Sequence, residues 1–107
     1  MYTPTDRDLP LIREYRTVPR RQWSIELKRL MNRLMIVPEE QRLVVVGLSR
    51  GGPWHLCQRK GIRGHPFVPL DERIFDKLAD AQWEVFKQRW KVVTGETVPA
   101  EYDGEIA

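Results

Sequence analysis

The chain has 107 residues, which is enough for one small domain with a single hydrophobic core. Hydrophobic residues make up 41% and charged residues 31%, values that exclude a disordered chain. No apolar run approaches the roughly 20 residues that cross a bilayer, and no hydrophobic block near the start resembles a signal peptide. The single cysteine, Cys57, excludes an internal disulfide framework. These features predict a soluble, cytoplasmic protein in a reducing compartment, without a membrane partner.

Residues 1–19 are expected to form an extended arm. Pro4, Pro10 and Pro19 each remove a backbone donor and disfavour helix in the residue before them.

A first helix is predicted from about Arg20 to Met35. Its apolar residues recur at helical spacing and share one face, with basic residues on the other side: Trp23, Leu27, Leu30 and Leu34. Arginines at the start of this segment oppose the helix dipole, so Ser24 is a second candidate for the N-cap.

Two interpretations fit residues 38–62. In the first, residues 42–49 and 54–59 are strands of a β-hairpin, because three consecutive valines suit a sheet and Gly51-Gly52-Pro53 supplies a turn. In the second, Pro38 begins a helix that Gly51 ends, and another helix follows, which makes the protein all-α. We favour the hairpin. The glycine and two prolines of residues 63–69 cannot form the recognition helix that the second interpretation requires.

The last predicted helix runs from Asp71, as N-cap, to about Val93, with Gly95 as its stop. Its apolar positions form an aliphatic and an aromatic sector, which together exceed the width of one core contact. Such a helix contacts two neighbours, or one neighbour and a partner molecule. Trp90 fits a core position, whereas Trp83 lies at the edge of the apolar arc and is the best candidate for an exposed contact.

These elements predict a small α+β protein with a helix–β-hairpin–helix layout, and the all-α fold is the alternative. The expected division is an arm over 1–19, one globular domain over 20–94 and an acidic tail over 95–107. A lone hairpin is marginal, so a third strand is expected from residues 10–18 or from a partner chain. Homodimerisation or assembly with other subunits is expected through that sheet edge or the last helix.

The charges are distributed unevenly although the net charge is only +3. Residues 1–70 carry 13 Lys and Arg against 6 Asp and Glu, whereas residues 71–107 carry 5 against 9. No acidic residue occurs from Gln41 to Leu70. Basic residues interleaved with aromatic ones in this stretch form the candidate nucleic-acid site: Arg50, Trp54, His55, Arg59, Lys60 and Arg63. The basic groups would hold phosphates and Trp54 would stack on a base, although Trp54 is at least as well suited to the core.

No catalytic, metal or cofactor site is expected. His55, Cys57 and His65 are the only His and Cys residues, which is one ligand short of a structural zinc site. A Cys–His nucleophile pair would need an orienting group that the sequence does not nominate. The Gly51-Gly52 segment lacks the ending of a P-loop, so a plain turn is favoured over a phosphate site.

The leading hypothesis is therefore a non-enzymatic binding module that contacts nucleic acid or a protein machine that handles it. The alternative is a structural or inhibitory protein-interaction subunit of a larger assembly. In that case Trp83, Trp90 and the N-terminal arm contact the partner, and the basic stretch is incidental or meets an acidic protein surface.

Overall fold

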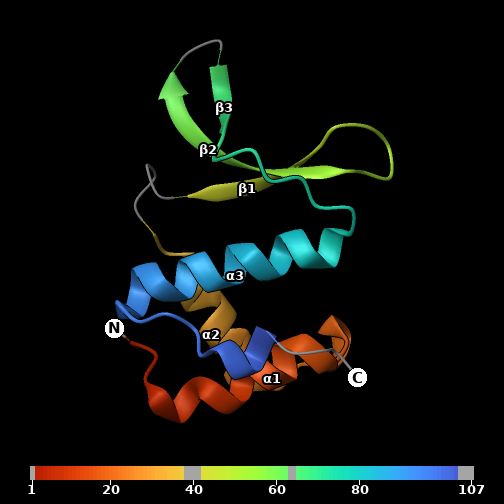
Figure 1. Ribbon diagram of the computed structural model, residues 1–107. Helices are drawn as coiled ribbons and strands as arrows, with labels where there is room; N and C mark the ends of the chain where they lie inside the picture. Colours follow the sequence, from red (N-terminus) through yellow and green to blue (C-terminus); the bar gives the residue numbers. More distant parts are fainter. Residues whose placement is uncertain (1, 38–41, 63–64, 104–107) are drawn as a thin grey trace. The chain divides into compact units, whose positions relative to one another are not determined.

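The computed structural model describes residues 2–37, 42–62 and 65–103. The main elements are three helices and three strands (Figure 1): α1 Leu9–Thr17, α2 Ile25–Leu34, β1 Leu43–Gly47, β2 Trp54–Ile62, β3 His65–Pro69 and α3 Leu78–Thr94. Short 3-10 helices occupy Asp6–Asp8, Arg20–Gln22 and Ala100–Asp103. The α+β class with a helix–hairpin–helix layout is confirmed, and the all-α alternative is wrong. No helix among the described residues has the length and apolar character needed to cross a membrane.

The chain divides into two compact units. The first comprises the described residues of Met1–Ile36 and Arg89–Ala107, and the second comprises those of Val37–Gln88. The predicted division into arm, domain and tail stays a prediction.

In the first unit the N-terminal segment is helical, so the expectation of an extended arm is wrong. Thr5 caps the first turn, because its backbone N–H donates to Asp8 Oδ2 at 2.9 Å and its hydroxyl accepts from Arg7 N. Pro10 then occupies the first turn of α1, where a helix needs no N–H from that residue. Ile12 of α1 is fully buried, and the third strand expected over residues 10–18 is absent from this part of the described chain.

The helix α2 begins at the later of the two candidate caps. Ser24 Oγ accepts from Leu27 N at 3.1 Å, and the residues before it form a 3-10 turn. The predicted apolar face is confirmed at three of its four residues, because Leu27, Leu30 and Leu34 are fully buried. Trp23, the fourth, precedes the helix and is half-buried. The C-terminal segment also packs in this unit, where Val98 is buried.

In the second unit the favoured hairpin is confirmed and a third strand extends it. The sheet is antiparallel in the order β1-β2-β3, with Val45 opposite Leu56 and Cys57 opposite Pro69. The strand β3 is not anticipated by the sequence pattern, because its two prolines favour a loop. As an edge strand, β3 can tolerate residues that lack an N–H.

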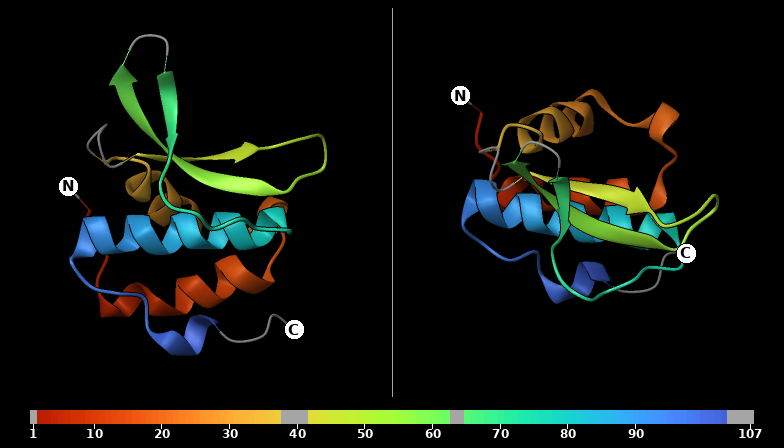
Figure 2. Two further views of the ribbon diagram at one scale, coloured as in Figure 1. Left: turned by 45° about the horizontal axis from the view of Figure 1, so that its top comes forward. Right: turned by 90° about the horizontal axis from the view of Figure 1, so that it is seen from above.

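One face of this sheet packs against the first part of α3 (Figure 2). Four buried side chains form this core, with three partly buried ones against them: Leu43, Leu56, Ala81 and Val85, then Val45, Trp54 and Phe75. The helix α3 begins seven residues later than the predicted cap at Asp71. Its end is as predicted, because Gly95 has a positive φ of 79° and its N–H donates to Lys91 O at 2.8 Å.

Candidate interaction surface

The loop between β1 and β2 is closed by its own hydrogen bonds. Leu48 N donates to Pro53 O at 2.9 Å, and Gly52 N donates to Ser49 O at 3.1 Å. The hydroxyl of Ser49 donates in turn to Gly52 O. Gly51 and Gly52 both have positive φ, a conformation that suits glycine. The amide of Gly52 is therefore used inside the loop, which is the plain turn that the sequence favoured over a phosphate site.

The indole of Trp54 packs closely against two glycines, and the backbone of Trp54 forms a bridge to another segment. A Cβ atom at Gly47 would lie 3.4 Å from Nε1 of the indole, and one at Gly52 would overlap its six-membered ring. Trp54 N donates to Phe75 O at 2.9 Å, and Phe75 N donates to Trp54 O at 2.8 Å. Trp54 therefore fixes the start of β2 against the segment that leads into α3, and its ring belongs to the core side of the sheet.

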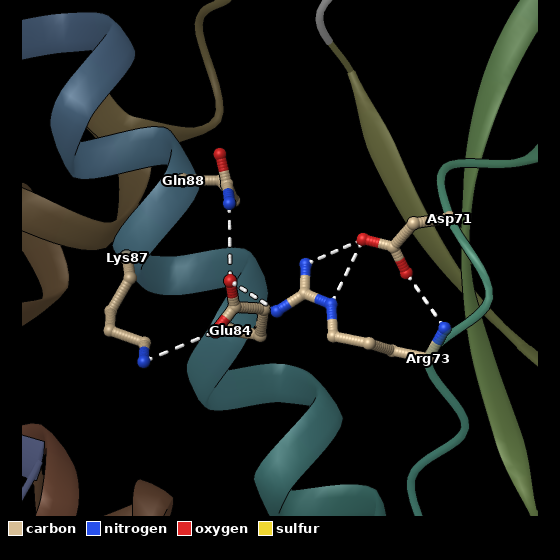
Figure 3. A network of polar contacts seen from close by, with 5 residues as sticks. All are labelled: Asp71, Arg73, Glu84, Lys87 and Gln88. Atoms are coloured by element: carbon tan, nitrogen blue, oxygen red, sulfur yellow. Dashed lines mark hydrogen bonds and ion pairs between the residues drawn. The ribbon is translucent and has the colours of Figure 1, made fainter.

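Ion pairs hold the segment before α3 (Figure 3). Arg73 Nε donates to Asp71 Oδ2 at 2.9 Å, and its Nη1 lies 3.0 Å from Glu84 Oε1. Glu84 also pairs with Lys87 Nζ at 3.1 Å and accepts from Gln88 Nε2 at 3.1 Å. Asp71, which the sequence offered as a helix cap, instead accepts from the backbone N–H of Arg73 and closes a turn.

The two carboxylates of this network titrate below their ordinary range. Hydrogen bonds from Arg73 lower the pKa of Asp71. Burial acts to raise the pKa of Glu84, but hydrogen bonds from Gln88, Lys87 and Arg73 outweigh it, and the net pKa is lowered.

Four large apolar side chains are exposed around this part of the second unit, and we call them the apolar patch: Leu48 (52% exposed), Leu70 (38%), Ile74 (54%) and Leu78 (40%). Leu48 is bonded to Pro53 on one side of Trp54, and Ile74 adjoins Phe75 on the other. Leu70 N donates to Leu56 O at 2.9 Å, which places Leu70 beside the same central strand. Large exposed apolar side chains of this kind are candidates for a protein interaction surface.

Three of the six residues of the predicted nucleic-acid site have described side chains, and the structure does not bring Trp54 and His55 among them onto one surface. Arg50 is exposed in the β1–β2 loop, and His55 is half-buried. Trp54 and His55 are consecutive in β2 and face opposite sides of the sheet, so the indole does not join His55 on one surface. Arg59 and Lys60 belong to β2, but their side chains lie outside the described part of the structure, as does the whole of Arg63.

Cys57 shares the sheet face of His55, as the hairpin interpretation expected. Its thiol is buried, and that burial raises its pKa, which disfavours the nucleophilic thiolate. Among the residues that the structure describes, no three His, Cys, Asp or Glu side chains gather as metal ligands would.

The expectation that Trp83 is exposed is wrong. Trp83 is 6% exposed, and its ring stacks on Phe86 with centroids 5.4 Å apart. Lys87 Nζ lies 5.5 Å from the same ring. Trp90 is 3% exposed and Phe86 is 2% exposed, so these aromatic positions of α3 are core, together with Ala81 and Val85. The interaction role proposed for both tryptophans therefore lacks an accessible surface in this chain.

The sequence did not predict the apolar patch, because α3 begins later than expected. A helix from Asp71 places Ile74 and Leu78 in its buried aliphatic sector. In the structure Ile74 precedes the helix and Leu78 is its first residue, and both are exposed.

Comparison with known proteins identifies the family. The family model of the N,N-dimethylformamidase alpha subunit matches residues 5–98, which is most of the chain. No curated protein and no solved structure matches. The match overturns the prediction of a non-enzymatic module that binds nucleic acid, because the matching family is a subunit of an enzyme. It favours the alternative, a subunit of a larger assembly. The chain belongs to the family of N,N-dimethylformamidase alpha subunits.

Proposed function

We propose that this chain is one subunit of an assembly that hydrolyses N,N-dimethylformamide or a related N,N-dialkylated amide. In that reaction water adds to the carbonyl carbon, the C–N bond breaks, and a carboxylic acid and a secondary amine leave. The family description carries the proposal, because an alpha subunit implies a second kind of subunit.

We assign the reacting groups to that other subunit. Amide hydrolysis needs an activated water or nucleophile and a group that stabilises the oxyanion. In the described residues the one thiol is buried with a raised pKa, and no cluster of three metal-ligating side chains occurs. Cys57 also supports a reducing compartment such as the cytoplasm for the assembly, since the thiol is free.

The contribution of this chain is to bind and stabilise the catalytic subunit. The apolar patch supports this role, because Leu48 and Ile74 are each more than half exposed in the chain alone. Burial of these side chains against a partner would remove apolar surface from water and so favour association.

The test is to capture the assembly through an affinity tag on this chain, from its source cells. The captured material is then assayed for amine release from N,N-dimethylformamide. We expect the chain alone to be inactive and the captured assembly to be active. Activity of the isolated chain would contradict the assignment of the reacting groups. An inactive capture from cells that hydrolyse the amide would contradict the proposed function.

The apolar patch is tested in the same assay. Ile74→Ser should reduce the captured activity, because it removes an exposed apolar contact without opening a cavity in the core. Val92→Ser is the matched control, since Val92 is 41% exposed in the other unit. Equal captured activity for both variants would exclude the patch from the interface.

A further inference from the structure

The strand β1 forms one edge of the sheet in the second unit. One hydrogen bond shows which of its residues are bonded to β2 through the backbone and which face outward. Leu48 N donates to Pro53 O, so residues 48 and 53 occupy a hydrogen-bonded position of the hairpin. Antiparallel pairs alternate, and therefore Val46 is bonded to His55, and Val44 to Cys57. The backbone N–H and C=O groups of Val45 and Gly47 point away from β2.

The hydrogen bonds on the other side of β2 agree with this alternation. Trp54, opposite Gly47, exchanges both backbone bonds with Phe75, and Leu56, opposite Val45, accepts from Leu70 N. The central strand is therefore bonded on both sides. In the described residues, Val45 and Gly47 have no partner strand on their outer side.

This edge has none of the features that usually prevent pairing with another chain. Natural edge strands carry charges, prolines or bulges. The strand β1 reads Leu-Val-Val-Val-Gly, and its register with β2 is regular over five residue pairs. The irregularity of this sheet lies between β2 and β3 instead.

We propose that β1 accepts a strand from the other subunit of the enzyme, which extends the sheet through the backbone groups of Val45 and Gly47. The inference rests on the proposed function, because the family description is what supplies a second subunit. Backbone pairing of this kind gives affinity, while the flanking side chains give specificity.

The chemistry of the incoming strand follows from the residues around β1. Val44 and Val46 are half-buried on the sheet face away from α3, so the strand should place apolar side chains beside them. Arg42 and Arg50 are exposed beyond the two ends of β1, and the sequence has no acidic residue from 41 to 70. The incoming strand should therefore be apolar at its centre and flanked by carboxylates.

Amide hydrogen exchange in the isolated chain and in the captured assembly tests the pairing directly. In the isolated chain, Val44 and Val46 should exchange slowly and Val45 and Gly47 fast. In the assembly, the amides of Val45 and Gly47 should slow by about tenfold or more. Unchanged exchange at both residues in an active assembly would overturn the inference and leave the proposed function standing.

Two variants supply an independent measurement. Val46→Lys places a charge on the edge and should weaken capture of the other subunit by about tenfold or more. Val92→Lys, on an exposed position of the other unit, should leave capture unchanged. Both proline variants replace a valine side chain, but of the backbone hydrogen-bond groups Val45→Pro removes the outward N–H and should weaken capture. Val46→Pro breaks the bond to His55 and should lower the melting temperature more.

The outcomes separate the two proposals. An inactive capture of the unaltered chain refutes the proposed function. An active assembly that Val46→Lys and Val45→Pro leave intact refutes the strand pairing alone. Protection of Val45 and Gly47 in the isolated chain that grows with its concentration shows pairing with a second copy, and this also overturns the inference.

Discussion

The indole of Trp54 occupies the space that a side chain at Gly52 would need. Gly52→Ala therefore introduces both an overlap with the indole and an alanine at a positive φ of 99°. It should lower the free energy of unfolding by about 2–4 kcal/mol. Urea denaturation measures the change. Gly51→Ala is the matched control: its φ is 86° but nothing lies within 4 Å of a new Cβ, so about 1–2 kcal/mol is expected. Equal losses in the two variants would show that the indole does not press on residue 52.

Glu84 links α3 to the segment that carries Arg73, and Glu84→Gln should weaken that link. The expected loss of stability is about 0.5–1 kcal/mol, because the Arg73 side chain is 46% exposed and solvent screens the pair. Glu72→Gln, an exposed change in the same segment, should have no measurable effect. A loss as large for Glu72→Gln would assign the effect to net charge rather than to the ion pairs.

The pH dependence of stability should follow the lowered pKa values of Asp71 and Glu84. A carboxyl whose pKa is lower in the folded state stabilises the fold fully above its unfolded pKa. This contribution disappears as the pH falls through the folded pKa. We therefore expect the stability from these groups to be complete above their ordinary values of 3.8 and 4.5 and to decline below them. The urea midpoint of Glu84→Gln should fall less between neutral pH and pH about 3 than that of the unaltered chain. Parallel curves would contradict the assignment.

The thiol of Cys57 should react slowly while the chain is folded. Burial both covers the sulfur and raises the pKa of the thiol, so little thiolate is present at neutral pH. Alkylation should be at least about tenfold slower in buffer than in concentrated guanidinium chloride. A native rate equal to the denatured rate would mean that this sheet face opens readily.

Trp83 should matter for stability rather than for surface recognition. Trp83→Ala removes a buried ring stacked on Phe86 and should cost about 3–5 kcal/mol of unfolding free energy. Gln82→Ala, at the exposed neighbouring position of α3, is the control and should cost little. A stable Trp83→Ala variant that fails to capture its partner would instead restore the interaction role predicted from the sequence.

Elements with a redundant pattern were predictable from the sequence. The buried face of α2 repeats the helical spacing, and the valines of β1 with the Gly51-Gly52 turn signal a hairpin. The class of the fold followed from these two observations.

The remaining elements depend on residues whose local signals support two outcomes. Pro10 was taken as a helix breaker but occupies a first helical turn, where proline is favoured. Asp71 carries the signal of an N-cap, but its carboxylate closes a turn with Arg73. The long-range bridge between Trp54 and Phe75 holds Phe75 outside the helix, and no local pattern contains that bridge.

The functional prediction failed for a related reason. A basic stretch interleaved with aromatic residues indicates affinity for anions in general and does not specify nucleic acid. In the structure Trp54 packs against the core, so its indole does not provide the stacking surface that the predicted site required. The family match supplied what charge and periodicity could not, the kind of assembly to which the chain belongs.

The carboxylate of Glu14 in α1 accepts from Ser24 N at 2.6 Å and from Ser24 Oγ at 2.8 Å. It therefore places a negative charge at the positive end of the α2 dipole and orients the hydroxyl that caps this helix. A shortened protein starting at residue 20, where the sequence alone would draw the boundary, would begin with a helix deprived of this anchor. Anyone who shortens the chain for crystallisation or fusion should keep α1, because Glu14 in this helix stabilises the start of α2.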